Sequence, residues 1–135
     1  MLTFEEIREM QRGERSSGKL VALPKDFWKN VAEYLANKMK KYEEAKQRAT
    51  KFTDKVLAQL ERELRNAAQV ILEIYRLREK KMLLLAWGEV STEEEADIRA
   101  LTPEERDLYK KIGETLKEAR QKILATVLAG EKVEK

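Results

Sequence analysis

Carboxylates are the side chains in this sequence best suited to acid–base chemistry, and several of them are adjacent. Two carboxylates held close together can act as general acid and general base, or can ligate a metal. Most of these groups, however, stand where a helix begins or on a face that is otherwise charged, which is typical of helix capping and solvent exposure. The adjacent acids are Glu5 with Glu6, Glu43 with Glu44, Glu93 with Glu94 and Glu95, and Glu104 with Glu105.

The composition removes most other catalytic chemistry. The chain of 135 residues contains no histidine and no cysteine. Histidine is the usual general base and the commonest transition-metal ligand, and cysteine supplies thiolates and disulfides. Hydrolytic triads with histidine and histidine-containing zinc sites are therefore excluded, and no glycine-rich phosphate-binding motif occurs. We predict a protein that is not an enzyme, with no catalytic, cofactor-binding or metal site.

Two cations interrupt an apolar helical stripe and are the most informative polar residues of the chain. The stripe continues at the same spacing onto Arg78 and Lys81, and the apolar set then shifts to other positions, so its packing partner is expected to change along the helix. A buried guanidinium must be paired, because leaving it alone costs several kcal/mol. Arg78 either snorkels at the edge of the stripe or is paired and fixes how helices or subunits meet. The apolar positions before the interruption are Leu57, Leu60, Leu64, Ala67, Ile71 and Ile74, the three-and-four spacing of knobs-into-holes packing.

The elements that position these residues are predicted to be helices throughout. Capping boxes, first-turn prolines and apolar spacing predict four main helices, with no strand signal and no repeat. Short connections favour antiparallel neighbours, so the fold class is an all-α bundle of about four antiparallel helices. The third helix is very long, roughly 50 Å at 1.5 Å per residue. The expected helices are 3–12, 24–48, 54–87 (ended by Gly88) and 102–130, with 13–18 as a polar loop and a short turn after Ser91.

The length and the hydropathy pattern predict one helical domain. Residues 1–130 form that domain, and the charged tail 131–135 is expected to begin a linker. The fourth helix should turn Leu108, Ile112, Leu116, Ile123, Val127 and Leu128 inward. No apolar run approaches the roughly 18 residues that a membrane span needs, and the N-terminus lacks the pattern of a signal peptide. We therefore predict a cytoplasmic protein.

Charged residues make up 39% of the chain, but the two signs nearly balance. Lysines and arginines number 28 against 25 acids, which gives a net charge of +3. Dispersed acids repel phosphate, so a dedicated DNA groove is disfavoured. The basic segment 38–55 is interpreted either as a solvated helix tip or as a weak DNA contact. Its candidate contact residues are Lys38, Lys41, Lys46, Arg48 and Lys51. The richness in Lys, Glu and Arg also resembles the composition of thermophile proteins.

Leucines and a tryptophan close the long helix. Trp87 follows Leu83, Leu84 and Leu85, and tryptophan is enriched at the energetic centres of protein interfaces. Trp87 is interpreted either as such an anchor or as a residue packed in the core. Trp28, near the start of the second helix, is expected to pack in the core.

Three segments in this order resemble the helical domain of GINS subunits, which act in DNA replication. They are LPKDFWKNVAEYL (23–35), RNAAQVILEIYRLREKKMLLLA (65–86, with ILEIYRLREKKMLLLA at its centre) and LTPEERDLYKKI (101–112). The similarity is greatest to the archaeal subunit class in which the helical domain comes first and a small β domain follows. The tail 131–135 is then expected to begin the linker to that β domain.

The resemblance implies a non-catalytic scaffold subunit located at the nucleoid. GINS subunits assemble as four, so this chain is expected to pair with a paralogous GINS subunit in a hetero-tetramer or with itself in a homo-tetramer. The assembly is expected to bind the MCM helicase and a Cdc45/RecJ-like protein, the latter contact relying on the β domain. The expected subunit-interface residues are Arg78, Lys81, Leu83, Leu84, Leu85 and Trp87, with Arg78 orienting the contact.

Two other functions stay open on the sequence alone. The first is an unrelated helical adaptor that forms a homo-oligomer through the same stripe, used as a coiled-coil seam. The second is a helical nucleic-acid-binding domain that uses the basic segment 38–55. The native mass with and without a GINS partner separates the adaptor from a GINS subunit, and the salt dependence of DNA affinity tests the nucleic-acid reading.

Overall fold

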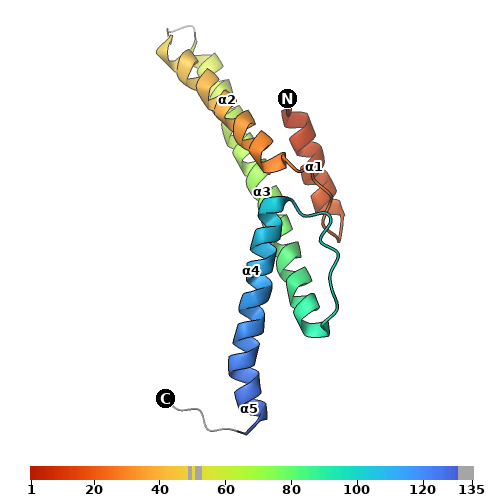
Figure 1. Ribbon diagram of the computed structural model, residues 1–135. Helices are drawn as coiled ribbons and strands as arrows, with labels where there is room; N and C mark the ends of the chain where they lie inside the picture. Colours follow the sequence, from red (N-terminus) through yellow and green to blue (C-terminus); the bar gives the residue numbers. More distant parts are fainter. Residues whose placement is uncertain (49, 51–52, 131–135) are drawn as a thin grey trace.

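The computed structural model describes residues 1–48, 50 and 53–130, and throughout these ranges the regular structure is helical, without a strand (Figure 1). This confirms the predicted all-α bundle with one very long helix. The elements are α1 (Phe4–Ser16), α2 (Phe27–Gln47), α3 (Asp54–Thr92), α4 (Pro103–Arg120), the π turn η1 (Gln121–Ala125) and α5 (Thr126–Leu128).

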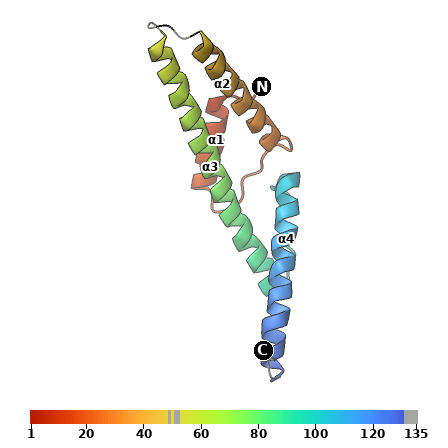
Figure 2. The same cartoon turned by 90° about the vertical axis from the view of Figure 1, so that its left-hand side faces the viewer.

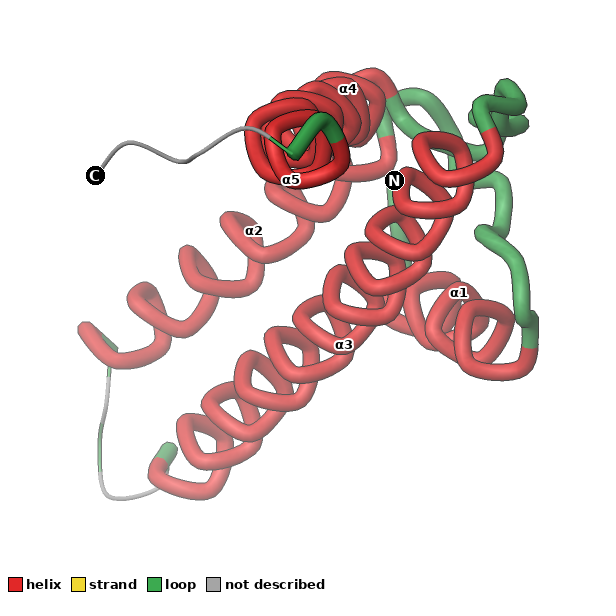
Figure 3. The backbone as a smooth tube through the Cα atoms, turned by 90° about the horizontal axis from the view of Figure 1, so that it is seen from below, coloured by secondary structure: helices red, strands yellow, loops and turns green. Residues whose placement is uncertain are grey.

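Helix α3 forms the axis of the molecule, and the other helices lie around it (Figure 3). With 39 residues it is about 58 Å long at 1.5 Å per residue. Helices α1 and α2 pack along its N-terminal part, and α4 packs along its C-terminal part (Figures 1 and 2). The change of packing partner expected from the sequence is thus present.

Only α2 runs antiparallel to α3. Helix α1 runs antiparallel to α2, as expected of consecutive helices, but α4 runs in the same direction as α3, so the expectation of antiparallel neighbours is wrong for α4 (Figure 1). The reason is the length of the connection 93–102, which carries the chain back along α3 before α4 begins. A connection of this length does not force consecutive helices into a hairpin as a short loop does.

Two of the predicted helix starts carry the expected caps. The side chain of Thr3 accepts a hydrogen bond from the backbone N–H of Glu6 at the start of α1. Thr102 and Glu105 form a complete capping box at the start of α4, with Pro103 in its first turn. These contacts satisfy backbone N–H groups that lack partners within the helix, which is why the helices begin there.

Two helix ends differ from the prediction, because tertiary contacts override glycine. Helix α1 passes through Gly13 to Ser16, and α3 passes through Gly88 to Thr92. Beyond Gly88, Glu89 accepts hydrogen bonds from the Tyr109 hydroxyl of α4 and from the Ala96 backbone, which hold the last turns of α3 in place. The short turn expected after Ser91 is absent as a separate element: α3 continues to Thr92, and Glu93, the residue that caps its end, adopts the left-handed conformation with φ 59°.

The buried residues form two apolar clusters along α3. The first cluster joins α1, α2 and the N-terminal half of α3, and it includes Ile7, Phe27, Val31, Tyr34, Ala67, Val70 and Ile74. The second joins the C-terminal half of α3 to α4 and the loop before it, and it contains Met82, Ala86, Leu101 and Tyr109. Burial, and then the hydrogen bond to Glu89, raise the pKa of Tyr109 to about 12. Trp28 lies at the edge of the first cluster, edge-on to Phe27 and Tyr75.

The end of the fourth helix is a further correction. Leu108, Ile112 and Leu116 pack inward as expected, but Ile123, Val127 and Leu128 are exposed. Helix α4 begins beside the middle of α3 and runs in the same direction, so its continuation extends past the end of α3 (Figures 1 and 2). The helical spacing places these residues on the same face as Leu116, but α3 ends before it can cover them. The predicted tail 131–135 lies outside the described residues.

In the described part of the chain, no helix combines the length and the apolar character required to cross a membrane.

Candidate protein interface

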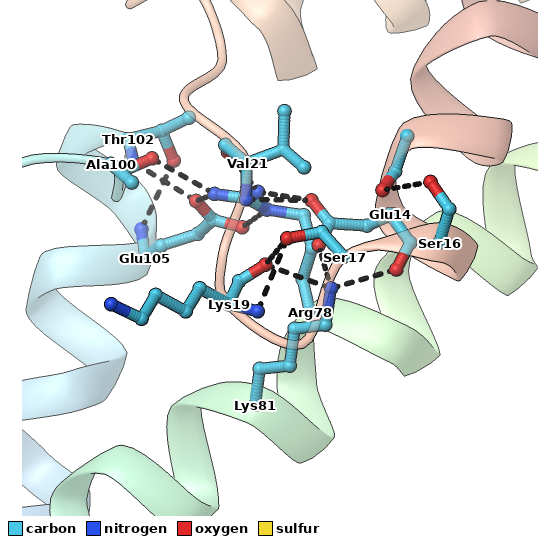
Figure 4. Close-up of polar contacts among 11 residues, drawn as sticks. Glu14, Ser16, Ser17, Lys19, Val21, Arg78, Lys81, Ala100, Thr102 and Glu105 are labelled. Atoms are coloured by element: carbon cyan, nitrogen blue, oxygen red, sulfur yellow. Dashed lines mark hydrogen bonds and ion pairs between the residues drawn. The ribbon is translucent and has the colours of Figure 1, made fainter.

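Arg78 lies completely buried between the two apolar clusters, and all its donors are used (Figure 4). The guanidinium has five N–H donors. Its Nε and Nη2 donate to the two carboxylate oxygens of Glu105, each at 2.7 Å. Its Nη1 donates to a carboxylate oxygen of Glu14 at 2.6 Å and to the carbonyl of Val21 at 2.6 Å. The fifth bond, from Nη2 to the carbonyl of Ala100, measures 3.0 Å.

Lys81, one helical turn further along α3, completes the arrangement. Its ammonium donates to the second carboxylate oxygen of Glu14, to the Glu14 carbonyl and to the Lys19 carbonyl. Glu14 is fully buried, and its carboxylate therefore lies between two cations. We call Glu14, Arg78, Lys81 and Glu105 the charge network.

Glu105 has two functions at once. One of its oxygens accepts the backbone N–H of Thr102 and so caps α4, while both oxygens accept hydrogen bonds from Arg78. Burial alone would raise the pKa of Glu105, but the hydrogen bonds from Arg78 and from the Thr102 backbone outweigh it, so the pKa lies below its ordinary value. The cap of α4 and the pairing of Arg78 therefore depend on the same carboxylate in its charged form.

The charge network holds five parts of one chain together. It joins α1 through Glu14, the loop 17–26 through two carbonyls, α3 through Arg78 and Lys81, the loop 93–102 through Ala100, and α4 through Glu105. Throughout residues 1–48, 50 and 53–130, every buried side-chain nitrogen and oxygen has a hydrogen-bond partner. Of the two interpretations of Arg78, the structure favours the paired cation, and it pairs helices of one chain. Since Arg78 has no exposed surface, its expected direct contact with another subunit is corrected to an internal role.

The lowered pKa of Glu105 leads to a first prediction, on acid stability. A carboxylate whose pKa is lower in the folded than in the unfolded protein stabilises the fold above the unfolded-state pKa, here 4.5. That contribution is lost as the pH falls through the folded-state pKa. We expect the melting temperature to fall steadily below about pH 4.5, and to fall less steeply in a Glu105→Gln variant. Calorimetry from pH 7 to pH 2 measures both slopes, and equal slopes would contradict the prediction.

The remaining expected interface residues divide into exposed and inward-facing ones. Leu83, Leu84 and Trp87 are 47%, 60% and 58% exposed. Trp87 is four residues after Leu83 and three after Leu84, so it lies next to both leucines on the surface of α3. We call these three residues the α3 patch. Leu85, in contrast, is half-buried against the second apolar cluster, and Lys81 is half-buried and bonded within the chain.

The basic segment presents three of its five candidate residues to solvent. Lys41, Lys46 and Arg48 are exposed on the C-terminal half and end of α2, where Glu43 and Glu44 are interspersed with them. Lys38 is half-buried and donates to Glu63 of α3 at 2.9 Å, an ion pair that lowers the pKa of Glu63. Lys51 lies outside the described residues.

The paired acids considered from the sequence do not converge on a site. Among the residues that the structure describes, no group of three or more acidic side chains is placed to hold a metal ion. Glu93, Glu94 and Glu95 line an open groove between the ends of α3 and α4, and Lys117 and Arg120 line its other side.

Sequence reasoning missed Glu14 and Glu105 as partners of Arg78, and it missed the exposed apolar end of the fourth helix. Glu14 was placed in a polar loop, although its spacing from Ile7 and Gln11 continues the buried face of α1. For Glu105, the capping box predicted its position in the first turn of α4. Neither signal identifies Arg78 as the partner.

Comparison with known proteins agrees with this arrangement of helices. Residues 1–124 match the family model of the GINS complex protein helical bundle domain. No curated protein and no solved structure matches the chain. The family match covers nearly all of the described helices, including the charge network and the α3 patch. The chain therefore belongs to the GINS family and is a subunit of a DNA-replication complex that assembles with other GINS subunits.

Proposed function

We propose that this chain is a non-catalytic scaffold subunit of a four-subunit GINS complex. In this proposal the complex joins the MCM replicative helicase to a Cdc45/RecJ-like protein at the nucleoid, and the chain itself supplies binding surfaces only. The observation that carries the proposal is the α3 patch, an apolar surface on a helix that the family match includes. Exposed leucines beside a tryptophan are the composition of an interface centre.

The charge network supports this role because it makes the surface rigid. Helix α3 is held by α1, by two loops and by α4 at the level of Arg78, about one and a half turns before Leu83 and about two and a half turns before Trp87. A surface that is already ordered loses little conformational entropy when it binds, so more of the contact energy appears as affinity. Burying the apolar area of the α3 patch contributes about 25 cal/mol per Å².

The native mass of co-expressed subunits tests the assembly. The chain is expressed alone and together with a paralogous GINS subunit of the same genome, and each sample is measured by light scattering. We expect a complex of two copies of each chain, or four copies of this chain where it assembles alone. A monomer that ignores the paralogous subunit would contradict the proposal and would leave a generic helical domain.

The helicase contact is tested with the assembled complex. MCM helicase immobilised on beads should retain the complex, and a Cdc45/RecJ-like protein should join it without displacing the helicase. Loss of one partner when the other is added would show competition for one surface and would contradict a bridging role. Retention of this chain alone, without its sister subunits, would place the helicase contact on this chain.

A second prediction concerns DNA. Lys41, Lys46 and Arg48 are exposed at one end of α2, and we propose that they add a weak contact to DNA within the assembly. The affinity is expected to fall with salt, and replacing the three residues with alanine should reduce the slope of log affinity against log salt by about 3 for duplex DNA. Fluorescence anisotropy of a labelled duplex at several salt concentrations measures the slope. An unchanged slope would show that these residues do not touch DNA.

A further inference from the structure

A pocket lies between two loops and α3, next to the charge network. Its volume is about 450 Å³, within the range of roughly 300–1,000 Å³ found for ligand pockets. We call it the loop pocket. Its lining comes from residues 18–20 of the loop 17–26, from Asp97 and Ala100 of the loop 93–102, and from Lys81, Leu84 and Leu85 of α3. Of the α3 patch, only Leu84 belongs to this lining.

The charge network fixes both loops that form the walls of the loop pocket. Lys81 donates to the carbonyl of Lys19 at 3.1 Å. Arg78 donates to the carbonyl of Ala100 at 3.0 Å. The hydroxyl of Ser17 also donates to the Lys19 carbonyl at 2.8 Å and accepts the Lys19 N–H at 3.1 Å. The pocket is therefore ordered before anything binds, and binding costs little conformational entropy.

One side of the loop pocket is apolar. Leu84 is exposed, while Leu20 and Leu85 are half-buried against the second apolar cluster. An apolar group that enters the pocket removes leucine surface from water, which is favourable in proportion to the area covered.

The charges around the loop pocket do not cancel. In the charge network two cations offset two carboxylates, and all three donors of Lys81 are used within the chain. At the rim, the hydrogen bonds from Arg99, and then the charge of Lys19, lower the pKa of Asp97. The ammonium of Lys19 extends away from the charge network and forms no ion pair within the described part of the chain (Figure 4). One lysine and one arginine against one aspartate leave a single positive charge at the rim.

We propose that the loop pocket binds a segment of a protein partner in which a leucine or an aromatic side chain stands next to an aspartate or glutamate. The apolar side chain packs against Leu20, Leu84 and Leu85, and the carboxylate accepts a hydrogen bond from the ammonium of Lys19. A free anion would use only one exposed lysine, and an uncharged apolar segment would leave the rim charge without a partner.

This inference concerns the single chain and does not rest on the proposed four-subunit assembly. Leu83 and Trp87 do not line the loop pocket, so a sister subunit seated on the α3 patch leaves most of its lining accessible. The partner in question is therefore one that the assembled complex can still bind.

Matched short peptides test the chemistry of the loop pocket. The chain with ¹³C-labelled leucine methyl groups is titrated with acetyl-Phe-Asp-amide and followed by NMR. We expect saturable shifts at Leu20, Leu84 and Leu85. The neutral peptide acetyl-Phe-Asn-amide should bind about two- to fivefold more weakly, the effect of one exposed ion pair. Equal affinity of the two peptides would overturn the proposal, as would shifts confined to other leucines.

Two further probes distinguish the proposed segment from a bare anion. Acetyl-Ala-Asp-amide and inorganic phosphate both carry negative charge without a large apolar group. We expect neither to shift the leucine methyl groups at the concentration that saturates acetyl-Phe-Asp-amide. Binding of either one as tightly as that peptide would show an anion site only and would overturn the proposal.

Reversing the charge of Lys19 should reverse the preference for peptides. Lys19 is exposed and contacts the charge network through its backbone carbonyl, so Lys19→Glu should keep the helical content. We expect this variant to bind acetyl-Phe-Lys-amide more tightly than acetyl-Phe-Asp-amide. The matched control is Lys25→Glu, an exposed residue of the same loop outside the pocket lining, which should keep the wild-type order. An unchanged order in Lys19→Glu would overturn the proposal.

The same titration of the complex with a paralogous subunit separates this inference from the proposed function. We expect the complex to bind acetyl-Phe-Asp-amide as tightly as the single chain does. Loss of binding on assembly would show that the sister subunit covers the pocket and would overturn the proposal. If the single chain binds the peptide but never binds a paralogous subunit, the proposed function fails and the inference on the loop pocket stands.

Discussion

Replacing Arg78 with methionine is expected to lower the free energy of unfolding by about 3–5 kcal/mol. Methionine leaves the carboxylates of Glu14 and Glu105 buried without their cation, and the carbonyls of Val21 and Ala100 without a donor. Lys81 still contacts Glu14 but does not contact Glu105. The loss of stability comes from these buried groups that have lost their partner. An intact buried ion pair by itself adds little to the free energy of unfolding.

The matched control is Arg76→Met, on the same helix two residues earlier. Arg76 is exposed, so its replacement should change the unfolding free energy by no more than about 0.5 kcal/mol. Urea denaturation followed by circular dichroism measures both variants. Arg78→Lys is informative as well, because lysine keeps the charge but cannot make the paired bonds to Glu105, and we expect a loss between those of the other two variants. A loss below about 1 kcal/mol for Arg78→Met would contradict the structural role given to the network.

The contacts of Arg78 also predict which helices lose stability in Arg78→Met. Helices α2 and α3 share the first apolar cluster, which does not include Arg78, whereas α4 is tied to α3 through Glu105 and the second cluster. In Arg78→Met we therefore expect hydrogen exchange to accelerate most in the loop 93–102 and in α4. Uniform acceleration through all helices would show that the chain unfolds as a single unit.

The sequence identified Arg78 as unusual but could not name its partners. The helical spacing showed that a cation stood in an apolar stripe, which requires only the 3.6-residue period. Its two carboxylate partners are 64 and 27 residues away in the chain. No local rule connects residues so far apart, and Gly13 made the region around Glu14 look like a loop. The buried contact of Glu14 with Arg78 outweighs the modest helix cost of one glycine, about 1 kcal/mol.

The direction of α4 could not be predicted from the sequence for a related reason. The connection 93–102 returns along α3 and places the start of α4 beside Arg78, so α4 runs parallel to α3. The sequence of this polar loop does not indicate its path. The path is fixed by the burial of Leu101 and by the hydrogen bond from Arg78 to the Ala100 carbonyl. The parallel direction also explains why Ile123, Val127 and Leu128 are exposed, because the fourth helix continues past the end of α3. Periodicity shows which residues share a face, but it does not show whether a neighbouring helix extends far enough to cover that face.

The second large effect is expected at the α3 patch. Leu84→Glu places a charge on a surface that becomes dry in the assembly, where an unpaired carboxylate costs several kcal/mol. Since Leu84 is 60% exposed in the single chain, the fold itself should tolerate the change. We expect the paralogous subunit to be lost from the complex in light scattering while the helical content by circular dichroism stays the same.

Trp87→Ala tests the same surface without adding a charge. Truncating a tryptophan at the centre of an interface typically costs 2 kcal/mol or more, which is about thirtyfold in the dissociation constant. The matched control is Leu72→Glu, because Leu72 is also an exposed leucine of α3, 46% exposed, but lies three turns before the patch. If Leu72→Glu dissociates the subunits and Trp87→Ala does not, the contact lies on the N-terminal half of α3. The patch would then be an exposed end of the helix, and the charge network would stabilise the single chain without preparing it for binding.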